Sequence, residues 1–157
     1  MLIASAGNRL LGDDGVGQVV LDRLRARSPW GGRVGFHALE GDLFELAEWA
    51  DKAEHLIVLD AIAGNPVGEI DRITGAAHEC HTPSFHQADV ATVLRQLELV
   101  NSSGVFPRWE VWGIRIEMPT EFRDRLSAPV ELAATHLEGL VVARVEKLLD
   151  AAPPTNG

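Results

Sequence analysis

Residues 7–17 are the most informative stretch of this chain, and they read Gly7-Asn8-Arg9-Leu10-Leu11-Gly12-Asp13-Asp14-Gly15-Val16-Gly17. A short apolar stretch, residues 2–6, comes directly before them and is typical of a buried strand. Behind the turn, Val16, Val20 and Leu24 recur at helical spacing. The order strand, turn, helix predicts the first unit of an α/β fold, and a turn in this position commonly holds a ligand.

The acidic residues of this turn exclude the usual phosphate binders. Gly7 and Gly12 have the spacing of a Walker loop, but Asp13 and Asp14 stand where such a loop has Lys and Ser or Thr. Two carboxylates would repel a phosphate, so the turn favours a cation. The dinucleotide fingerprint also fails, because the glycines come in the wrong order. Helix capping is the alternative interpretation of the acids, although capping needs only one of them.

The composition predicts a single domain. The chain has 157 residues, of which 46% are hydrophobic and 24% charged, and this is enough apolar material for a sheet covered on both faces. We expect the domain to span residues 1–150 and the Pro-rich residues 151–157 to form a flexible tail. The 14 Lys and Arg against 23 Asp and Glu give a net charge of −9. This balance argues against a nucleic-acid partner and favours a cationic peptide or a metal ion.

Cysteine usage and hydropathy predict the compartment. Cys80 is the only cysteine, so no disulfide can form within the chain, and a reducing cytoplasm is the natural location. No stretch approaches the ~18 apolar residues of a membrane span, and the N-terminus lacks the basic start of an export signal. We therefore expect a cytoplasmic protein with no membrane partner.

The pattern along the chain predicts alternating strands and helices in a mixed sheet. The connection at residues 61–68 is too short for a crossover helix, so the strand that follows it should run antiparallel to the strand before it. The last helix has an N-terminal signature at Ser127 and Pro129. Beyond the first unit, we expect strands at residues 33–39, 55–60, 69–74 and 108–116, and helices at residues 43–52, 85–101 and from about 127 onward.

Three residues far apart in sequence are candidates for one site. If the second strand lies outside, right-handed crossovers place the first and third strands side by side, and the ends of both strands form a switch point. Asp14 and Asp60, which is expected to end the third strand, would both lie there. His86 lies in a capping box, Ser84-Phe85-His86-Gln87, where the helix dipole favours the neutral imidazole that ligates metals. Two carboxylates and one imidazole suit nickel, zinc or a similar divalent ion better than magnesium.

Other interpretations remain open at this stage. Asp60 alone is most simply a turn residue. The cluster His78-x-Cys80-His81 offers softer metal ligands, but there is no second Cys/His pair to complete a structural zinc site, and a solvated loop is expected first. Trp109 and Trp112 cannot share one face of a strand, so we expect at least one of them to be exposed.

These residues resemble the hydrogenase maturation proteases, the endopeptidases that trim the C-terminus of the large subunit of nickel–iron hydrogenases. The resemblance covers roughly the whole chain that is expected to fold. Glu40-Gly41 and residues 113–117 fit it more loosely. The most specific matches are residues 7–17, Leu59-Asp60-Ala61 and Ser84-Phe85-His86-Gln87 ahead of an apolar helix.

The resemblance implies a fold and a site. The fold is a three-layer α/β/α arrangement around a twisted, mixed five-stranded sheet with one antiparallel strand, of the phosphorylase/hydrolase-like type. The nickel-sensing site of the family corresponds here to Asp14, Asp60 and His86, which would be both the metal ligands and the catalytic residues. The first position is often Glu in the family, so Asp14 is one methylene shorter.

The resemblance also implies an activity. A nickel-dependent endopeptidase would remove the C-terminal extension of a hydrogenase large-subunit precursor in the cytoplasm, after nickel has entered that precursor. Nickel would arrive with the substrate, and zinc or another divalent ion could occupy the same site. Either a carboxylate or the metal could activate water. We expect the protein to work as a monomer.

Three rival functions stay open. A nickel-binding chaperone or carrier would use the same three ligands without cutting anything. An aspartic-type peptidase, in which Asp14 and Asp60 share a proton, would work best at acid pH and would cleave whether or not the precursor holds nickel. A small-molecule hydrolase on the same scaffold would need an enclosed pocket, whereas a protein-processing site should lie in an open cleft.

Overall fold

The computed structural model describes residues 1–39, 41–50, 52–75, 90–101 and 106–151. Five strands and four α-helices make up this part of the chain, together with three short 3-10 turns. The strands are β1 (Leu2–Ser5), β2 (Gly35–Ala38), β3 (His55–Ala63), β4 (Ile70–Thr74) and β5 (Arg108–Ile116). The helices are α1 (Val16–Arg27), α2 (Leu46–Ala50), α3 (Val90–Val100) and α4 (Ala128–Ala151), and the 3-10 turns are η1 (Gly12–Gly15), η2 (Gly31–Arg33) and η3 (Leu43–Glu45).

The sheet is mixed and has the strand order β2-β1-β3-β5-β4. β1 and β3 lie side by side, as the crossover rule predicts, and both are parallel to their neighbours. β4 is the antiparallel strand. Its direction relative to β3 is as predicted, but β5 lies between the two, so β4 pairs with β5. The C-terminal ends of β1 and β3 thus meet at one edge of the sheet.

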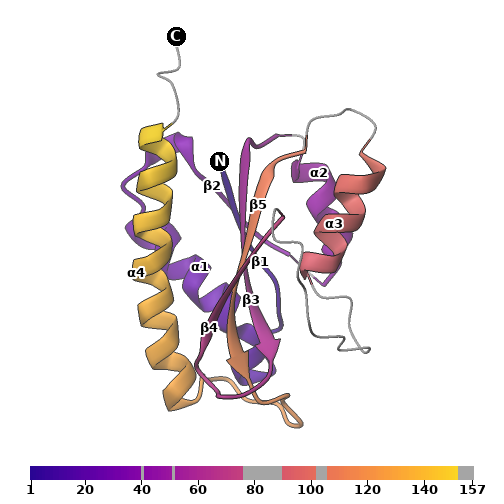
Figure 1. Cartoon of the computed structure of the whole chain (residues 1–157). Coiled ribbons are helices and arrows are strands. Elements are labelled where there is room, and N and C mark those ends of the chain that lie inside the picture. The colour runs from indigo at the N-terminus through magenta and orange to yellow at the C-terminus, as the bar shows by residue number, and fades with distance from the viewer. Residues whose placement is uncertain (40, 51, 76–89, 102–105, 152–157) are drawn as a thin grey trace.

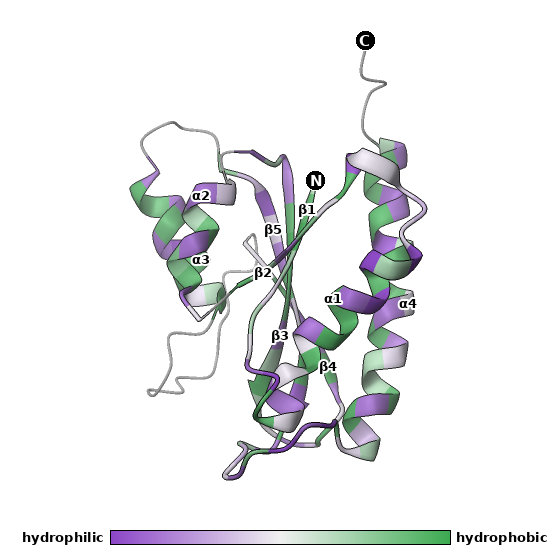
Figure 2. Ribbon diagram, turned by 180° about the vertical axis from the view of Figure 1, so that it is seen from behind, coloured by the Kyte–Doolittle hydropathy of each residue, from purple (hydrophilic) through white to green (hydrophobic). Residues whose placement is uncertain are grey.

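Helices cover both faces of the sheet and make a three-layer α/β/α fold. Figure 1 shows α1 and α4 on one face and α2 and α3 on the other. Successive side chains of β3 point to opposite faces of the sheet and so contribute to two separate cores. Ile57 and Leu59 pack toward α1 and α4, while Leu56 and Val58 pack toward α3. Figure 2 shows that these helices carry hydrophobic and hydrophilic residues in turn, as helices with one buried face do.

The two tryptophans of β5 correct one expectation. Trp109 and Trp112 do point to opposite faces, but Trp109 is only 3% exposed and Trp112 only 9%. Trp109 belongs to the core under α3, and Trp112 belongs to the core under α1 and α4. The prediction that one of them is exposed is wrong, because both faces of the sheet are covered.

Several predicted boundaries shift. β3 continues three residues beyond Asp60, because Asp60 still pairs with Gly113 of β5. The helix expected at residues 43–52 is a 3-10 turn followed by the short α2. Residues 85–89 of the predicted third helix lie outside the described residues, and α3 begins at Val90. The longest described helix is α4 with 24 residues, and none of the described helices has the length and hydropathy that a membrane crossing requires.

Candidate active site

The turn after β1 is held by a glycine that no other residue could replace without strain. Gly7 has a φ of +103°, and a Cβ atom at this position would lie 2.0 Å from the carbonyl oxygen of Asp14. The backbone at Gly7 therefore passes directly over η1, the 3-10 turn that carries Asp14. The glycines that looked like a phosphate loop serve instead to fold the chain tightly around an acid.

A second close approach presses α1 onto the ends of two strands. A Cβ at Gly17 would lie 2.5 Å from the carbonyl oxygen of Leu59 and 2.9 Å from that of Ala6. The amide of Ala6, directly after β1, donates a hydrogen bond of 2.9 Å to the carbonyl of Leu59 in β3. The start of α1 thus lies at the edge where β1 and β3 end, and this packing brings the acidic turn to the predicted switch point.

Side chains of the same region anchor the turn to α1. Gln18 donates from Nε2 to the carbonyl oxygen of Gly7 at 2.9 Å, and Arg9 donates from Nε to Oε1 of Gln18 at 2.9 Å. Arg9 also forms an ion pair with Asp22 one turn further along the helix. The turn is therefore rigid, as a site for oriented ligands requires.

Asp14 is a half-buried carboxylate oriented by one backbone bond. Its Oδ2 accepts a hydrogen bond of 2.8 Å from the amide of Asn8, within the same turn. An ionised carboxylate has about four lone-pair sites, so this single bond leaves capacity for a metal or a proton. No arginine or lysine among the described residues forms an ion pair with Asp14.

Asp13, its neighbour, has a structural role. Its Oδ1 accepts from the amide of Ser127 at 2.6 Å, and its Oδ2 accepts from the Ser127 hydroxyl at 2.7 Å. Ser127 directly precedes α4, so Asp13 caps that helix across 114 residues of sequence, while α1 has no side-chain cap. The capping interpretation is correct for one acid of the pair, but the capped helix is α4 instead of α1.

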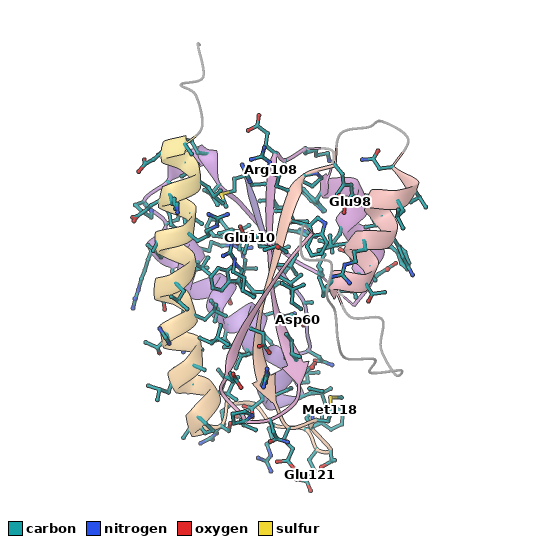
Figure 3. The ribbon with its side chains drawn as sticks, viewed as in Figure 1. Asp60, Glu98, Arg108, Glu110, Met118 and Glu121 are labelled. Atoms are coloured by element: carbon teal, nitrogen blue, oxygen red, sulfur yellow. The ribbon has the colours of Figure 1, made fainter. Side chains whose placement is uncertain are left out.

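Asp60 lies in β3, just beyond the point where β1 ends. The last pair between β1 and β3 is Ser5 with Leu59, so Asp60 is the first residue of β3 beyond the end of β1. Its Oδ1 accepts a hydrogen bond of 2.8 Å from the amide of Ala61. Figure 3 places Asp60 in the half of the sheet toward which β3 points, the same half that carries Met118 and Glu121.

The structure thus brings two of the three predicted site residues to one edge. Asp14 contacts the backbone of Gly7, Gly7 follows Ala6, and Ala6 bonds to Leu59, the residue before Asp60. His86 lies outside the described residues, and so does the alternative cluster of His78, Cys80 and His81. Within the described ranges, no group of three His, Cys, Asp or Glu side chains could hold a metal ion. Two carboxylates can supply only some of the ligands of a divalent ion, so a metal bound here would need further ligands from other groups.

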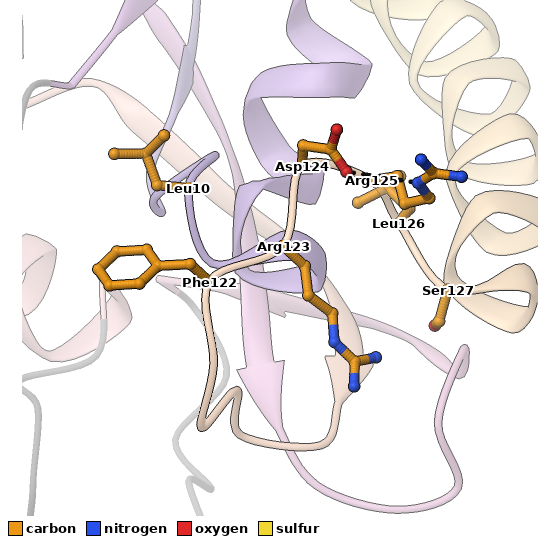
Figure 4. A pocket seen from close by; sticks show the side chains of 7 residues that line it. All are labelled: Leu10, Phe122, Arg123, Asp124, Arg125, Leu126 and Ser127. Atoms are coloured by element: carbon orange, nitrogen blue, oxygen red, sulfur yellow. Dashed lines mark hydrogen bonds and ion pairs between the residues drawn. The ribbon is translucent and has the colours of Figure 1, made fainter.

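A second loop borders the acidic turn, and sequence reasoning missed it. The amide of Arg123 donates to the carbonyl of Leu10 at 3.0 Å, and the amide of Gly12 donates to the carbonyl of Arg123 at 2.9 Å, which makes a short parallel bridge. The two segments line an open hollow of about 640 Å³ (Figure 4). A signal was present, because Met118 and Phe122 are large apolar residues in a stretch rich in charged residues. The lining residues are Leu10, Phe122, Arg123, Asp124, Arg125, Leu126 and Ser127.

No protein-family model and no curated protein sequence matches this chain, but solved structures do. An endopeptidase from Escherichia coli is 26% identical, with a TM-score of 0.75 over 93% of this chain and 91% of that one. The hydrogenase maturating endopeptidase HybD from Escherichia coli is 25% identical, with a TM-score of 0.71 over 93% and 92% of the two chains.

A third structure shows the same fold at lower identity. The NiFe hydrogenase maturation protease HybD from Thermococcus kodakarensis is 21% identical, with a TM-score of 0.64 over 94% of this chain and 97% of that one. The likeness to the two Escherichia coli proteins, over almost the full length of both chains, supports a peptidase role. In fold and, more distantly, in sequence, the chain is therefore similar to solved hydrogenase maturation endopeptidases over almost its full length.

Proposed function

We propose that this protein is an endopeptidase that removes the C-terminal extension of a nickel–iron hydrogenase large-subunit precursor after nickel has been inserted. The observation that supports the proposal is that the glycine-bound turn carrying Asp14 packs at the end of the β1–β3 pairing, where Asp60 is the next residue of β3. The likeness to HybD, a hydrogenase maturating endopeptidase, supplies the class of substrate.

The surface beside the site suits a polypeptide substrate. The hollow next to the acidic turn is open and is lined by residues of two surface loops. An enclosed cavity would favour a small molecule, whereas an open surface admits an extended chain on its way to and from a larger protein. We therefore favour protein processing over small-molecule hydrolysis on this scaffold.

In this proposal the metal is part of the substrate. Asp14 and Asp60 contribute carboxylate oxygens and His86 contributes a ring nitrogen, a mixed set that suits nickel. Since the two described members alone do not complete a metal site, the remaining ligands come from His86 and from the precursor. A precursor without nickel would lack the group that joins enzyme to substrate, so it would be left uncut.

The chemistry is the hydrolysis of one peptide bond. A carboxylate of the site accepts a proton from water as the water oxygen attacks the scissile carbonyl carbon, and the C–N bond then breaks as the proton passes to the leaving amine. A general base of this kind contributes about 10²- to 10⁴-fold to the rate. We place the reaction in the cytoplasm and expect the enzyme to act as a monomer.

The test is an intact-mass assay of a purified nickel-loaded large-subunit precursor from the source organism. The enzyme should shorten this precursor and leave the nickel-free form intact. The variants Asp14→Asn, Asp60→Asn and His86→Gln should each lose at least about 10²-fold in rate. The control variant Glu121→Gln changes an exposed acid for which no described residue is a bonding partner, and it should process normally.

Each other outcome points to a different function. Binding of the nickel-loaded precursor without any loss of mass would identify a nickel carrier and overturn the peptidase proposal. Cleavage that ignores nickel and is fastest at acid pH would identify an aspartic-type peptidase, in which Asp14 and Asp60 share a proton. Unchanged processing by all three site variants would overturn the assignment of the site.

A further inference from the structure

Two large apolar side chains are exposed together beside the acidic turn. Leu10 is 65% exposed and Phe122 is 80% exposed, and both line the hollow between the two loops. Figure 4 shows the Leu10 and Phe122 side chains on the same side of that hollow, while the side chain of Arg123, the next residue, extends away from them. We call the surface made by Leu10, Phe122 and Arg123 the ledge.

The exposure of the ledge is not explained by the needs of the fold. Single exposed apolar residues are common on proteins, but neighbouring ones from separate segments mark interaction sites. Leu10 follows β1 and Phe122 follows β5, so the fold brings them to one hollow from distant parts of the sequence. Each residue could be polar without any loss of core packing, because neither belongs to either core.

The ledge is also held rigidly in place. Its two segments are joined by the backbone bonds between Leu10, Gly12 and Arg123. The far end of the second segment is fixed by the bonds of Ser127 to Asp13, the neighbour of Asp14. Because Leu10 and Asp14 lie in one turn, and Arg123 is bonded to that turn through Leu10 and Gly12, a ligand that binds the ledge is held at a constant position relative to Asp14. Preorganisation of this kind lowers the entropic cost of binding.

The charge of the ledge indicates the charge of its ligand. Arg125 forms an ion pair with Asp124 at 3.3 Å, but the exposed Arg123 has no acidic partner among the described residues. The chain as a whole carries a net charge of −9, so an unpaired arginine at this place is not a consequence of general basicity. An arginine next to exposed apolar side chains recognises a carboxylate attached to an apolar group.

We propose that the ledge binds the C-terminal extension of the precursor through one apolar side chain, which packs between Leu10 and Phe122, and one carboxylate, which pairs with Arg123. This inference rests on the proposed function, because it assigns the ligand from the substrate of the neighbouring site. The ledge then acts as a specificity-determining surface that positions the peptide next to Asp14, and it takes no part in the chemical step.

Binding is tested by nuclear magnetic resonance titration of the full chain with short synthetic peptides. One peptide carries leucine and aspartate, a second replaces leucine by serine, and a third replaces aspartate by asparagine. The first peptide should shift the amide signals of Leu10, Phe122 and Arg123, and the other two should bind more weakly. Phe122→Ser should weaken binding of the first peptide about tenfold, and Arg123→Gln should weaken it about threefold.

Matched controls come from the opposite end of the sheet. Leu99, which is 84% exposed at the end of α3, and Arg108, at the start of β5, have the same chemistry far from the ledge (Figure 3 labels Arg108). Leu99→Ser and Arg108→Gln should leave peptide binding unchanged. Phe122 and Arg123 are both exposed, so their variants are expected to fold. Shifts elsewhere on the protein, or equal binding of all three peptides, would overturn the proposal.

Processing of the nickel-loaded precursor separates this inference from the proposed function. Phe122→Ser and Arg123→Gln should raise KM with little change in kcat, whereas Asp60→Asn should lower kcat. If the parent protein cuts the precursor and both ledge variants keep its KM, the ledge proposal fails and the peptidase stands. If the peptides bind at the ledge but no precursor is cut, the peptidase proposal fails and the ledge remains a peptide-binding surface.

Discussion

The middle of β5 and the turn after β1 both hold a carboxylate, but the two surroundings differ completely. Glu110, in β5, is 7% exposed and accepts hydrogen bonds from Arg144 Nε at 2.8 Å, Arg72 Nε at 3.0 Å and Trp112 Nε1 at 3.1 Å. Asp14 accepts one backbone bond, from Asn8. A carboxylate whose lone pairs are all used holds a structure together, whereas one with unused lone pairs can bind a metal or accept a proton.

The pKa of Glu110 shows which effect dominates in the buried network. Burial by itself would raise the pKa of Glu110, because it disfavours the charged form. The hydrogen bonds from Arg144, Arg72 and Trp112 outweigh burial and hold the pKa below its usual value. Glu110 therefore stays ionised and joins β4, β5 and α4, so its role is to stabilise the fold.

The largest effect on stability should come from breaking this network. Glu110→Ala leaves two arginines and a tryptophan without their acceptor, and loss of one partner from a buried ion pair costs about 3–5 kcal/mol. The free energy of unfolding should fall by that amount in urea titrations. Glu121→Ala, which removes an exposed acid, should change it by less than about 0.5 kcal/mol. Equal effects of the two substitutions would contradict the distinction between buried and exposed acids.

A substitution at the turn should affect both stability and processing. Gly7→Ala puts a Cβ 2.0 Å from the carbonyl of Asp14 at a φ of +103°, so the backbone that carries Asp14 must move. Backbone strain of this kind costs about 1–3 kcal/mol, and a displacement near 1 Å can cost about 10²-fold in rate. Thermal unfolding and the precursor assay measure the two effects.

Gly41 offers a matched control for that prediction. It has the same φ of +103°, but a Cβ there would meet nothing within 4 Å. Gly41→Ala should therefore introduce the same backbone strain without moving Asp14. The variant should be less stable than the parent and should process the precursor normally. A comparable loss of processing in both variants would show that strain alone, and not the position of Asp14, limits the reaction.

A smaller effect is expected from the two adjacent acids of the turn. Asp13→Ala removes both bonds to Ser127, and loss of a helix cap costs about 0.5–2 kcal/mol. Asp14→Ala should cost less stability, because only one bond to Asn8 is lost, but it should lose far more processing activity. Chemical denaturation and the mass assay of both variants check this. A reversed order would mean that Asp14, and not Asp13, is the structural acid.

The smallest effect is a change in the pH dependence of stability. Since the pKa of folded Glu110 lies below the 4.5 of the unfolded chain, Glu110 contributes stability that is complete above 4.5 and is lost as the pH falls through the folded pKa. Glu110→Gln has no charge to lose, so its unfolding free energy should fall less than that of the parent between about pH 5 and 3. Parallel curves for the two proteins would contradict the lowered pKa.

Local patterns in the sequence were enough to predict most of the fold. The alternation of apolar segments with turn residues located the strands and helices, and the short connection before β4 required an antiparallel strand because it cannot hold a crossover helix. The neighbourhood of β1 and β3 followed from the handedness of crossovers. The resemblance in residues 7–17 added the family, and the comparisons agree with it.

The candidate site was predicted less completely. The sequence placed Asp14 and Asp60 at one edge of the sheet, and the structure puts them there, but their roles and that of His86 stay predictions. The length of β3 beyond Asp60 was missed, because pairing with the full length of β5 extends the strand past its apolar run. The burial of both β5 tryptophans was missed because it depends on helices far away in sequence.

The acidic, glycine-bound turn and the layers around it follow from local patterns in the chain, because periodicity and turn chemistry act over short stretches and crossovers have one preferred hand. The different bonding partners of Asp13 and Asp14 become visible only in the folded chain. Asp13 bonds to Ser127 across 114 residues, and Leu10 and Phe122 line one hollow because a bridge joins their two loops. Such contacts depend on how distant segments pack, and no local pattern in the chain encodes them.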